Sequence, residues 1–186
     1  MKGFVVGFAA AAITASAGAA TITYTFSGVT SGSLGADTFD NAAFVVTLVG
    51  DTDNIEGNVL DQPNVYGLRT SATIQIAGLP LATVSGSEDV GIFANDDVNA
   101  VGFWRYEQAD MLDVFGGSLD GYHLATDFGP EAFDQIFTGW GSLSTDQGLL
   151  NGAASGPVTF TARLVPAPGA MALLGMGGLM AARRRR

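Results

Sequence analysis

The sequence predicts an all-β fold: an antiparallel β-sandwich of jelly-roll or immunoglobulin-like type with at most one short helix. An N-terminal signal helix and a C-terminal transmembrane helix are expected to flank it. Short segments with a hydrophobic period of two recur through the middle of the chain, and turns rich in Gly, Asp and Asn separate them. Uncharged apolar runs occupy both ends. Cysteine is absent, so the fold must rest on an apolar core without disulfides or thiolate zinc sites.

Residues 1–20 have the layout of a cleaved secretory signal peptide. Lys2 supplies a positive charge, residues 3–13 are uncharged and largely apolar, and a run of small residues follows. The small-x-small rule places cleavage after Ala19 or Ala20. The apolar stretch is too short to span a bilayer, and a strand-like segment follows at once. We therefore expect an exported protein that meets the Sec translocon and a signal peptidase.

Residues 21–165 form the predicted extracellular β-domain. Its expected strands are residues 21–26, 42–50, 71–78, 98–106, 111–117 and 157–165. In the first, threonines alternate with Ile22, Tyr24 and Phe26, which predicts one solvated and one buried face. The last places four apolar residues on one face: Val158, Phe160, Ala162 and Leu164. Glycine-rich turns between such strands favour a twisted antiparallel arrangement.

Residues 129–139 (GPEAFDQIFTG) predict the single helix of the domain. Pro130 stands early and Glu131 lies in the first turn, as is usual at helix starts. Three apolar residues then recur at helical spacing: Phe133, Ile136 and Phe137.

Residues 166–186 combine three features in a fixed order. A proline motif comes first, in the stretch Val165, Pro166, Ala167 and Pro168. The uncharged run 168–182 follows; at about 1.5 Å per residue a helix of this length spans about 22 Å, somewhat short of a bilayer core of about 30 Å. The chain ends in four arginines, Arg183, Arg184, Arg185 and Arg186. Arginines can snorkel to the headgroups and stay on the cytoplasmic side, so we expect a stop-transfer helix with the domain outside.

This tail resembles the PEP-CTERM sorting signal of Gram-negative bacteria. The match covers residues 165–186, with Pro166-Ala167-Pro168 where the family usually has Pro-Glu-Pro. The resemblance implies recognition by an exosortase, a membrane cysteine protease-transpeptidase that cuts near the proline motif. The domain would then be released or attached to an extracellular matrix, often in bacteria that make exopolysaccharide. The protein would be the substrate of the sorting enzyme, with exopolysaccharide as a further candidate partner.

The charge distribution excludes one class of partner. The chain carries 8 basic and 18 acidic residues, and Lys2 with the terminal arginines accounts for most of the basic ones. The middle keeps only Arg69, Arg105 and Arg163 beside all 18 acidic residues, a net charge of −15. Such a domain repels phosphate backbones, so we expect no binding to nucleic acid.

Acidic loops provide the candidate metal ligands. Asp51, Asp53 and Glu56 share one loop, and Asp96 and Asp97 share another. Calcium takes hard oxygen ligands of this kind, and extracellular calcium can fill weak sites. The glycine and terminal glutamate of an EF-hand loop are missing, and Asp and Asn favour turns for local reasons. A calcium site and a merely solvated loop both stay open, and no other cofactor is predicted.

Catalytic motifs are poorly represented, and the protein is expected not to be an enzyme. The nearest approach to a nucleophile elbow is residues 116–120 (GGSLD), which lacks the final glycine. His123 is the single histidine, so a Ser-His-Asp site would have to use it. The many acidic residues offer so many possible carboxylate pairs that none is informative.

Large aromatic side chains provide candidate sugar contacts. Trp104, Tyr106 and Trp140 could stack on sugar rings, although most aromatics of such folds fill the core. In residues 103–106 (FWRY), alternation separates Trp104 and Tyr106 from Phe103, so one aromatic pair is expected to face outward or lie at a sheet edge.

Three classes of function follow. The favoured one is a non-enzymatic structural or matrix protein, held transiently in the inner membrane and then placed at the cell surface or outside it. The second is a carbohydrate-binding module associated with exopolysaccharide, which requires an exposed Trp104 or Trp140. The third is a secreted hydrolase, which requires His123 beside a serine and an acid in a cleft.

Overall fold

The computed structural model describes residues 20–86, 89–106 and 109–165. The signal segment through Ala19, the proline motif from Pro166 onward and the arginine cluster lie outside these residues. Among the residues that are described, no helix has the length and hydropathy needed to cross a membrane.

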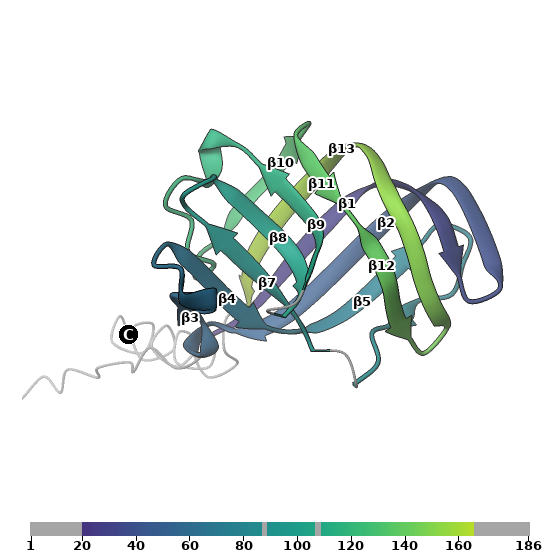
Figure 1. Cartoon of the computed structure of the whole chain (residues 1–186), viewed down its shortest axis with the longest axis horizontal. Helices are drawn as coiled ribbons and strands as arrows, with labels where there is room; N and C mark the ends of the chain where they lie inside the picture. The colour runs from purple at the N-terminus through teal and green to yellow at the C-terminus, as the bar shows by residue number, and fades with distance from the viewer. Residues whose placement is uncertain (1–19, 87–88, 107–108, 166–186) are drawn as a thin grey trace, which may run out of the picture.

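The described chain consists almost entirely of antiparallel strands in two sheets (Figure 1). The seven-stranded sheet runs β10-β13-β1-β2-β5-β6, with β12 also paired to β13. Its strands are β1 (Thr21–Leu34), β2 (Asp37–Asp51), β5 (Ser71–Ile76), β6 (Ala82–Thr83), β10 (Phe128–Phe133), β12 (Trp140–Thr145) and β13 (Gly148–Val165). The six-stranded sheet runs β11-β9-β8-β7-β4-β3. Its strands are β3 (Glu56–Gly57), β4 (Val65–Arg69), β7 (Val90–Asn95), β8 (Ala100–Arg105), β9 (Ala109–Phe115) and β11 (Ile136–Thr138).

Helical structure is limited to three single 3-10 turns within the described residues. These are η1 (Thr52–Asn54), η2 (Val59–Asp61) and η3 (Gly117–Leu119). The prediction of an all-β antiparallel domain is therefore confirmed.

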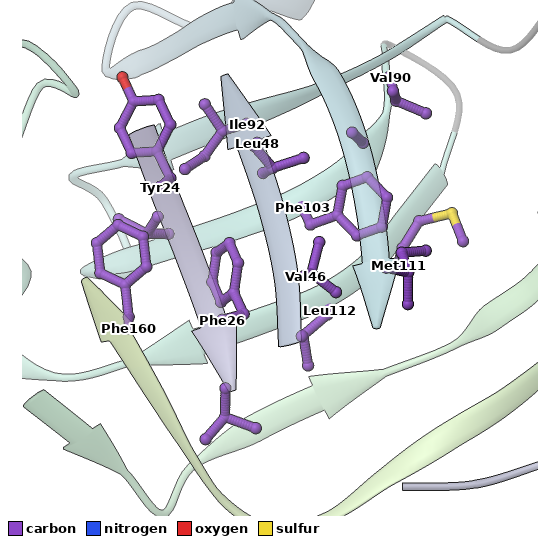
Figure 2. Close-up of a cluster of buried hydrophobic side chains, with 14 of the residues drawn as sticks. Tyr24, Phe26, Val46, Leu48, Val90, Ile92, Phe103, Met111, Leu112 and Phe160 are labelled. Atoms are coloured by element: carbon purple, nitrogen blue, oxygen red, sulfur yellow. The ribbon is translucent and has the colours of Figure 1, made fainter. Parts of the chain in front are cut away.

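The inner faces of the two sheets share one core, part of which is drawn in Figure 2. The alternation predicted in the first strand is confirmed, because Ile22, Tyr24 and Phe26 are fully buried. The six-stranded sheet contributes Phe103 and Leu112 to the same cluster. Complete burial of an apolar side chain of this size contributes about 1.5–3 kcal/mol, so the shared core is the main source of stability.

Three long strands, β1, β2 and β13, organise the seven-stranded sheet. The register of β1 with β13 runs from Thr21 opposite Val165 to Leu34 opposite Leu150. An isolated bridge joins Val84, which directly follows β6, to Thr145, the last residue of β12. These contacts connect the β6 edge of the sheet to β12 and so reduce its free edge.

The outer face of this sheet carries a cross-strand row of threonines. The row crosses five strands and consists of Thr161, Thr25, Thr47, Thr73 and Thr83. Threonine has a high preference for strands, and cross-strand threonine pairs add to sheet stability. This solvated face is the one that the alternation in residues 21–26 predicts.

The predicted helix at residues 129–139 is wrong. The segment forms β10, which pairs with β13, and β11, which pairs with β9 of the other sheet. Phe133 is buried in the core, whereas Phe137 is 48% exposed, so the apolar residues do not share a helical face. Backbone pairing with two different sheets outweighs a weak local preference for helix.

The predicted strands all exist, but the structure has more strands than predicted and several of them are longer. β1 continues eight residues past Phe26 to Leu34, and β13 begins at Gly148. In β13, Val158, Phe160 and Ala162 are buried as expected. Leu164, expected on the same face, is 37% exposed because it lies at the strand end, beyond the core.

Candidate functional site on the outer face of the six-stranded sheet

The aromatic residues predicted to contact sugars are buried. Trp104, Tyr106 and Trp140 are each 2% exposed. Trp140 packs edge-on against Phe44 in the main core, with ring centroids 5.1 Å apart. The exposed Trp104 or Trp140 that the carbohydrate-binding class requires is therefore not found, and these three rings do not offer a sugar an open stacking surface.

Trp104 and Tyr106 nevertheless lie on the outer side of their sheet, as alternation predicts. Phe103 belongs to the main core, whereas the pair belongs to a second, smaller cluster. The buried members of this outer cluster are Val59, Val65, Phe93, Ala100, Trp104 and Tyr106. The Trp104 ring centroid lies 5.1 Å from that of Phe93 and 5.0 Å from that of Tyr106. Rings at these spacings stabilise one another beyond their buried area.

Glycines on the neighbouring strands make room for these rings. A Cβ at Gly91 would overlap the Leu68 carbonyl oxygen and lie 2.9 Å from Tyr106 Cδ2, and one at Gly102 would overlap the Phe93 ring and Asp113 Oδ1. The outer cluster thus requires a missing side chain at each of these two positions.

Polar contacts extend the outer cluster toward β3. The Arg69 guanidinium lies 3.8 Å from the Tyr106 ring centroid and also pairs with Asp89. The Tyr106 hydroxyl donates a hydrogen bond to Glu56 Oε2 at 3.1 Å. Glu56 therefore serves to hold a buried tyrosine, and residues 56–61 next to it line a pocket of about 340 Å³.

A β-bulge places two carboxylates on this outer face. The register of β8 and β9 shifts so that Phe103 lies opposite Leu112 and Trp104 opposite Asp110. The extra residue, Met111, and Leu112 both point into the main core. Asp110 and Asp113 consequently share the outer face although they are three positions apart, which is the type of reorientation that bulges produce.

The two carboxylates have different surroundings. Asp113 is 4% exposed, and burial together with the negative charge of Asp110 raises its pKa to about 8. Partial burial also raises the pKa of Asp110, which lies at the exposed rim. At neutral pH Asp113 is therefore mostly a neutral carboxylic acid, which can both donate and accept hydrogen bonds.

Two buried polar atoms of this face lack hydrogen-bond partners among the described residues: Asp113 Oδ1 and Trp104 Nε1. A buried polar atom without a partner costs about 1–3 kcal/mol. Most buried polar atoms in folded proteins are paired, so two such atoms on one face mark it as the candidate functional site.

The predicted calcium loop does not form a metal site. Asp51 Oδ1 accepts a hydrogen bond from the Asp53 backbone N–H at 3.0 Å and caps η1, while Glu56 bonds Tyr106. Across residues 20–86, 89–106 and 109–165, no three His, Cys, Asp or Glu side chains are grouped closely enough to hold a metal ion.

The second acidic loop is also occupied by protein contacts. Asp96 Oδ2 lies 2.8 Å from His123 Nε2, and the His123 ring stacks on Tyr66 with centroids 4.1 Å apart. Asp97 Oδ1 accepts a hydrogen bond from Asn64 Nδ2 at 2.7 Å. These contacts join three loops at one end of the fold.

The residues named for nucleophilic catalysis are not brought together. His123 bonds Asp96, whereas the Ser118 hydroxyl donates to Glu131 Oε1 at 2.6 Å. In the part of the chain that the structure describes, the two do not form the serine–histidine hydrogen bond on which such a mechanism depends.

The sorting residues that can be located lie at the ends of the described fold. Val165 ends β13 opposite Thr21. The Ala20 carbonyl accepts a hydrogen bond from the Thr52 backbone N–H at 3.0 Å. Ala19, Pro166 to Pro168 and Arg183 to Arg186 are outside the described residues.

Sequence reasoning did not find Asp110 and Asp113. A strand without a bulge would place residues three apart on opposite faces, and the pattern shows no bulge.

Comparison of the chain with protein-family models, curated proteins and solved structures finds no match in any of the three.

Proposed function

We propose that this protein is an exported, non-enzymatic component of the cell surface or extracellular matrix, delivered by an exosortase-type system. The order of the C-terminal features carries the proposal: a proline motif, an uncharged run and four arginines directly follow the last strand. A secretory signal layout directly precedes the first strand. Two antiparallel sheets around one core support a β-sandwich of jelly-roll or immunoglobulin-like type between the two signals.

Elementary energetics supports this proposed route of delivery. The N-terminal segment directs the chain to the Sec translocon and is removed after Ala19 or Ala20. The uncharged run 168–182 then halts in the inner membrane, because moving one arginine to the bilayer centre costs about 2.5–3.5 kcal/mol and four adjacent arginines multiply that barrier. The exosortase cuts beside Pro166 to Pro168 and releases or attaches the domain.

The paired ends of the fold suit this route. Thr21 and Val165 are opposite one another in neighbouring strands, so both flanking segments begin at the same end of the domain. In our proposal this end faces the membrane, and the turn between β1 and β2 points away from it.

Two tail variants in the native host test the proposal. Replacing Arg183 to Arg186 with serine removes the stop, so uncut protein with its tail intact should escape to the periplasm or medium. Replacing Pro166 and Pro168 with alanine removes the cleavage motif, so uncut protein should accumulate in the membrane. Mass spectrometry of the membrane and soluble fractions distinguishes these outcomes.

A matched control replaces two prolines of the folded domain. Pro63 and Pro80 are both exposed. Changing both to alanine should leave processing unchanged. Wild-type cutting and delivery of the serine variant would show that the arginines are not the stop, and the account of the tail would be wrong.

A further inference from the structure

The outer face of the seven-stranded sheet is a regular array of small side chains, most of which carry a hydroxyl group. Three neighbouring cross-strand rows run over β13, β1, β2 and β5, and β6 extends the middle row. Together they form what we call the threonine face: Thr159, Ser27, Val45 and Gln75; Thr161, Thr25, Thr47, Thr73 and Thr83; Arg163, Thr23, Val49 and Ser71.

The threonine face contains no acidic side chain, although the domain is strongly acidic. β1, β5, β6 and β13 lack aspartate and glutamate altogether, and β2 has them only near its two ends, at Asp37, Asp40 and Asp51. Arg163 is the single charged residue of the face, and its guanidinium donates hydrogen bonds to backbone carbonyl oxygens of β10 and β13. About a quarter to a third of the residues on a soluble surface are normally charged. The shortage of charge here favours contact with a partner.

The chemistry of the threonine face is self-complementary. A hydroxyl group both donates and accepts hydrogen bonds, so a face rich in hydroxyls can pair with an identical face. Val45 and Val49 flank Thr47 along β2 and are 39% and 38% exposed, so contact would also remove apolar surface from water. A two-fold contact between identical subunits requires a surface that matches itself in this way.

We propose that the threonine face binds the threonine face of a second copy of this chain. Residues 21–165 carry three arginines and 18 acidic residues, so two copies repel each other wherever their acidic loops meet. Contact through the threonine face leaves the six-stranded sheet, with Glu56, Asp110 and Asp113, on the far side of each copy. Twisted sheets of the same hand stack face to face with their strands about 30° apart, so twist does not prevent the contact.

The size of the threonine face sets the expected strength of the dimer. From the usual spacings between strands and between same-face residues, five strands and three rows cover about 20 Å by about 20 Å with their side chains. This area is near the lower limit for specific interfaces, about 600 Å² of accessible surface per partner. We therefore expect a dimer that dissociates on dilution. The inference concerns only the folded strands and does not rest on the sorting proposal.

Cross-linking of the full chain in a mild detergent detects the contact. The chain has no cysteine, so Thr47→Cys introduces a single thiol at the centre of the face. Thr38→Cys introduces one at an exposed position of the same strand outside the face. A short bis-maleimide should link Thr47→Cys into dimers about tenfold more than Thr38→Cys, because the contact raises the effective concentration of the facing thiols. Equal linking of the two, which association through the flanking segments alone would give, or no linking of either, would overturn the proposal.

Second substitutions in the Thr47→Cys chain test the role of charge. Thr25→Asp, and independently Thr73→Asp, should reduce linking about tenfold, because like charges that face each other across an interface are strongly unfavourable. Thr25→Val keeps the branched shape without charge, and Thr38→Asp adds the same charge outside the face, so both should link like the parent chain. Urea unfolding identifies the variants that are folded. A folded aspartate variant of the face that links fully would contradict the proposal.

Salt supplies a readout that adds no charge to the face. Charges act over about 30 Å at about 0.01 M salt and over about 3 Å at about 1 M salt. Linking of Thr47→Cys should therefore rise with salt, relative to Thr38→Cys, because the repulsion between two acidic domains is screened. A fall in linking would show that the copies meet through pairs of opposite charge, and the threonine face would not be the interface.

Discussion

The ionisation of Asp113 is strongly coupled to the fold. Its pKa rises from 3.8 to about 8, first because the carboxyl is buried and second because Asp110 is negatively charged. Between these pH values the folded protein holds a proton that the unfolded chain has released. The contribution of Asp113 to the free energy of unfolding is therefore fully present below about pH 4. It is lost as the pH rises to about 8. One pKa unit corresponds to about 1.4 kcal/mol, so the loss amounts to several kcal/mol.

Asp113→Asn should remove this pH dependence. Asparagine is nearly isosteric and stays neutral, so the variant should unfold at higher urea concentration than the wild type at pH 8 to 9. The difference should shrink toward pH 4. Urea unfolding at a series of pH values measures it, with Asp37→Asn as the exposed control that should keep the wild-type slope. A wild-type slope in Asp113→Asn would contradict the assigned burial of this carboxyl.

At the scale of elements, the bulge between β8 and β9 and the glycine beside it create the outer face. Gly102→Ala would drive a methyl group into the Phe93 ring and Asp113 Oδ1. Overpacking of this kind costs about 1–3 kcal/mol, so the midpoint of urea unfolding should fall. Gly117→Ala is the control, because a Cβ there meets no atom within 4 Å. Equal stability of the two variants would show that the rings can move away from Gly102.

Strict alternation made the first strand predictable down to the face on which each side chain lies. TITYTF places threonine outside and Ile22, Tyr24 and Phe26 inside, and this local pattern survives in the fold. Residues 129–139 were misassigned because their partners in β13 and β9 are distant in sequence, and no local pattern reports them. The candidate site could not be predicted for the same reason. A bulge depends on two strands, and the burial of Trp104 depends on Val59 and Phe93 from other elements.

At the scale of the whole molecule, the charge distribution and the paired ends of the folded domain bear on the proposed export. The domain is acidic throughout its loops, while the threonine row leaves one sheet face uncharged along its centre. Thr21 and Val165 meet at one end, so removal of both flanking segments would leave the paired strands intact. A domain of this layout can be exported, cut on both sides and still keep its core.

The masses of the mature termini test the account most directly. Protein isolated from the native host should begin at Ala20 or Thr21 and should end close to Pro166 to Pro168, without the arginine cluster. Intact-mass and terminal-peptide mass spectrometry measures both ends at once. A mature protein that begins at Met1 and still ends at Arg186 would contradict export and sorting together.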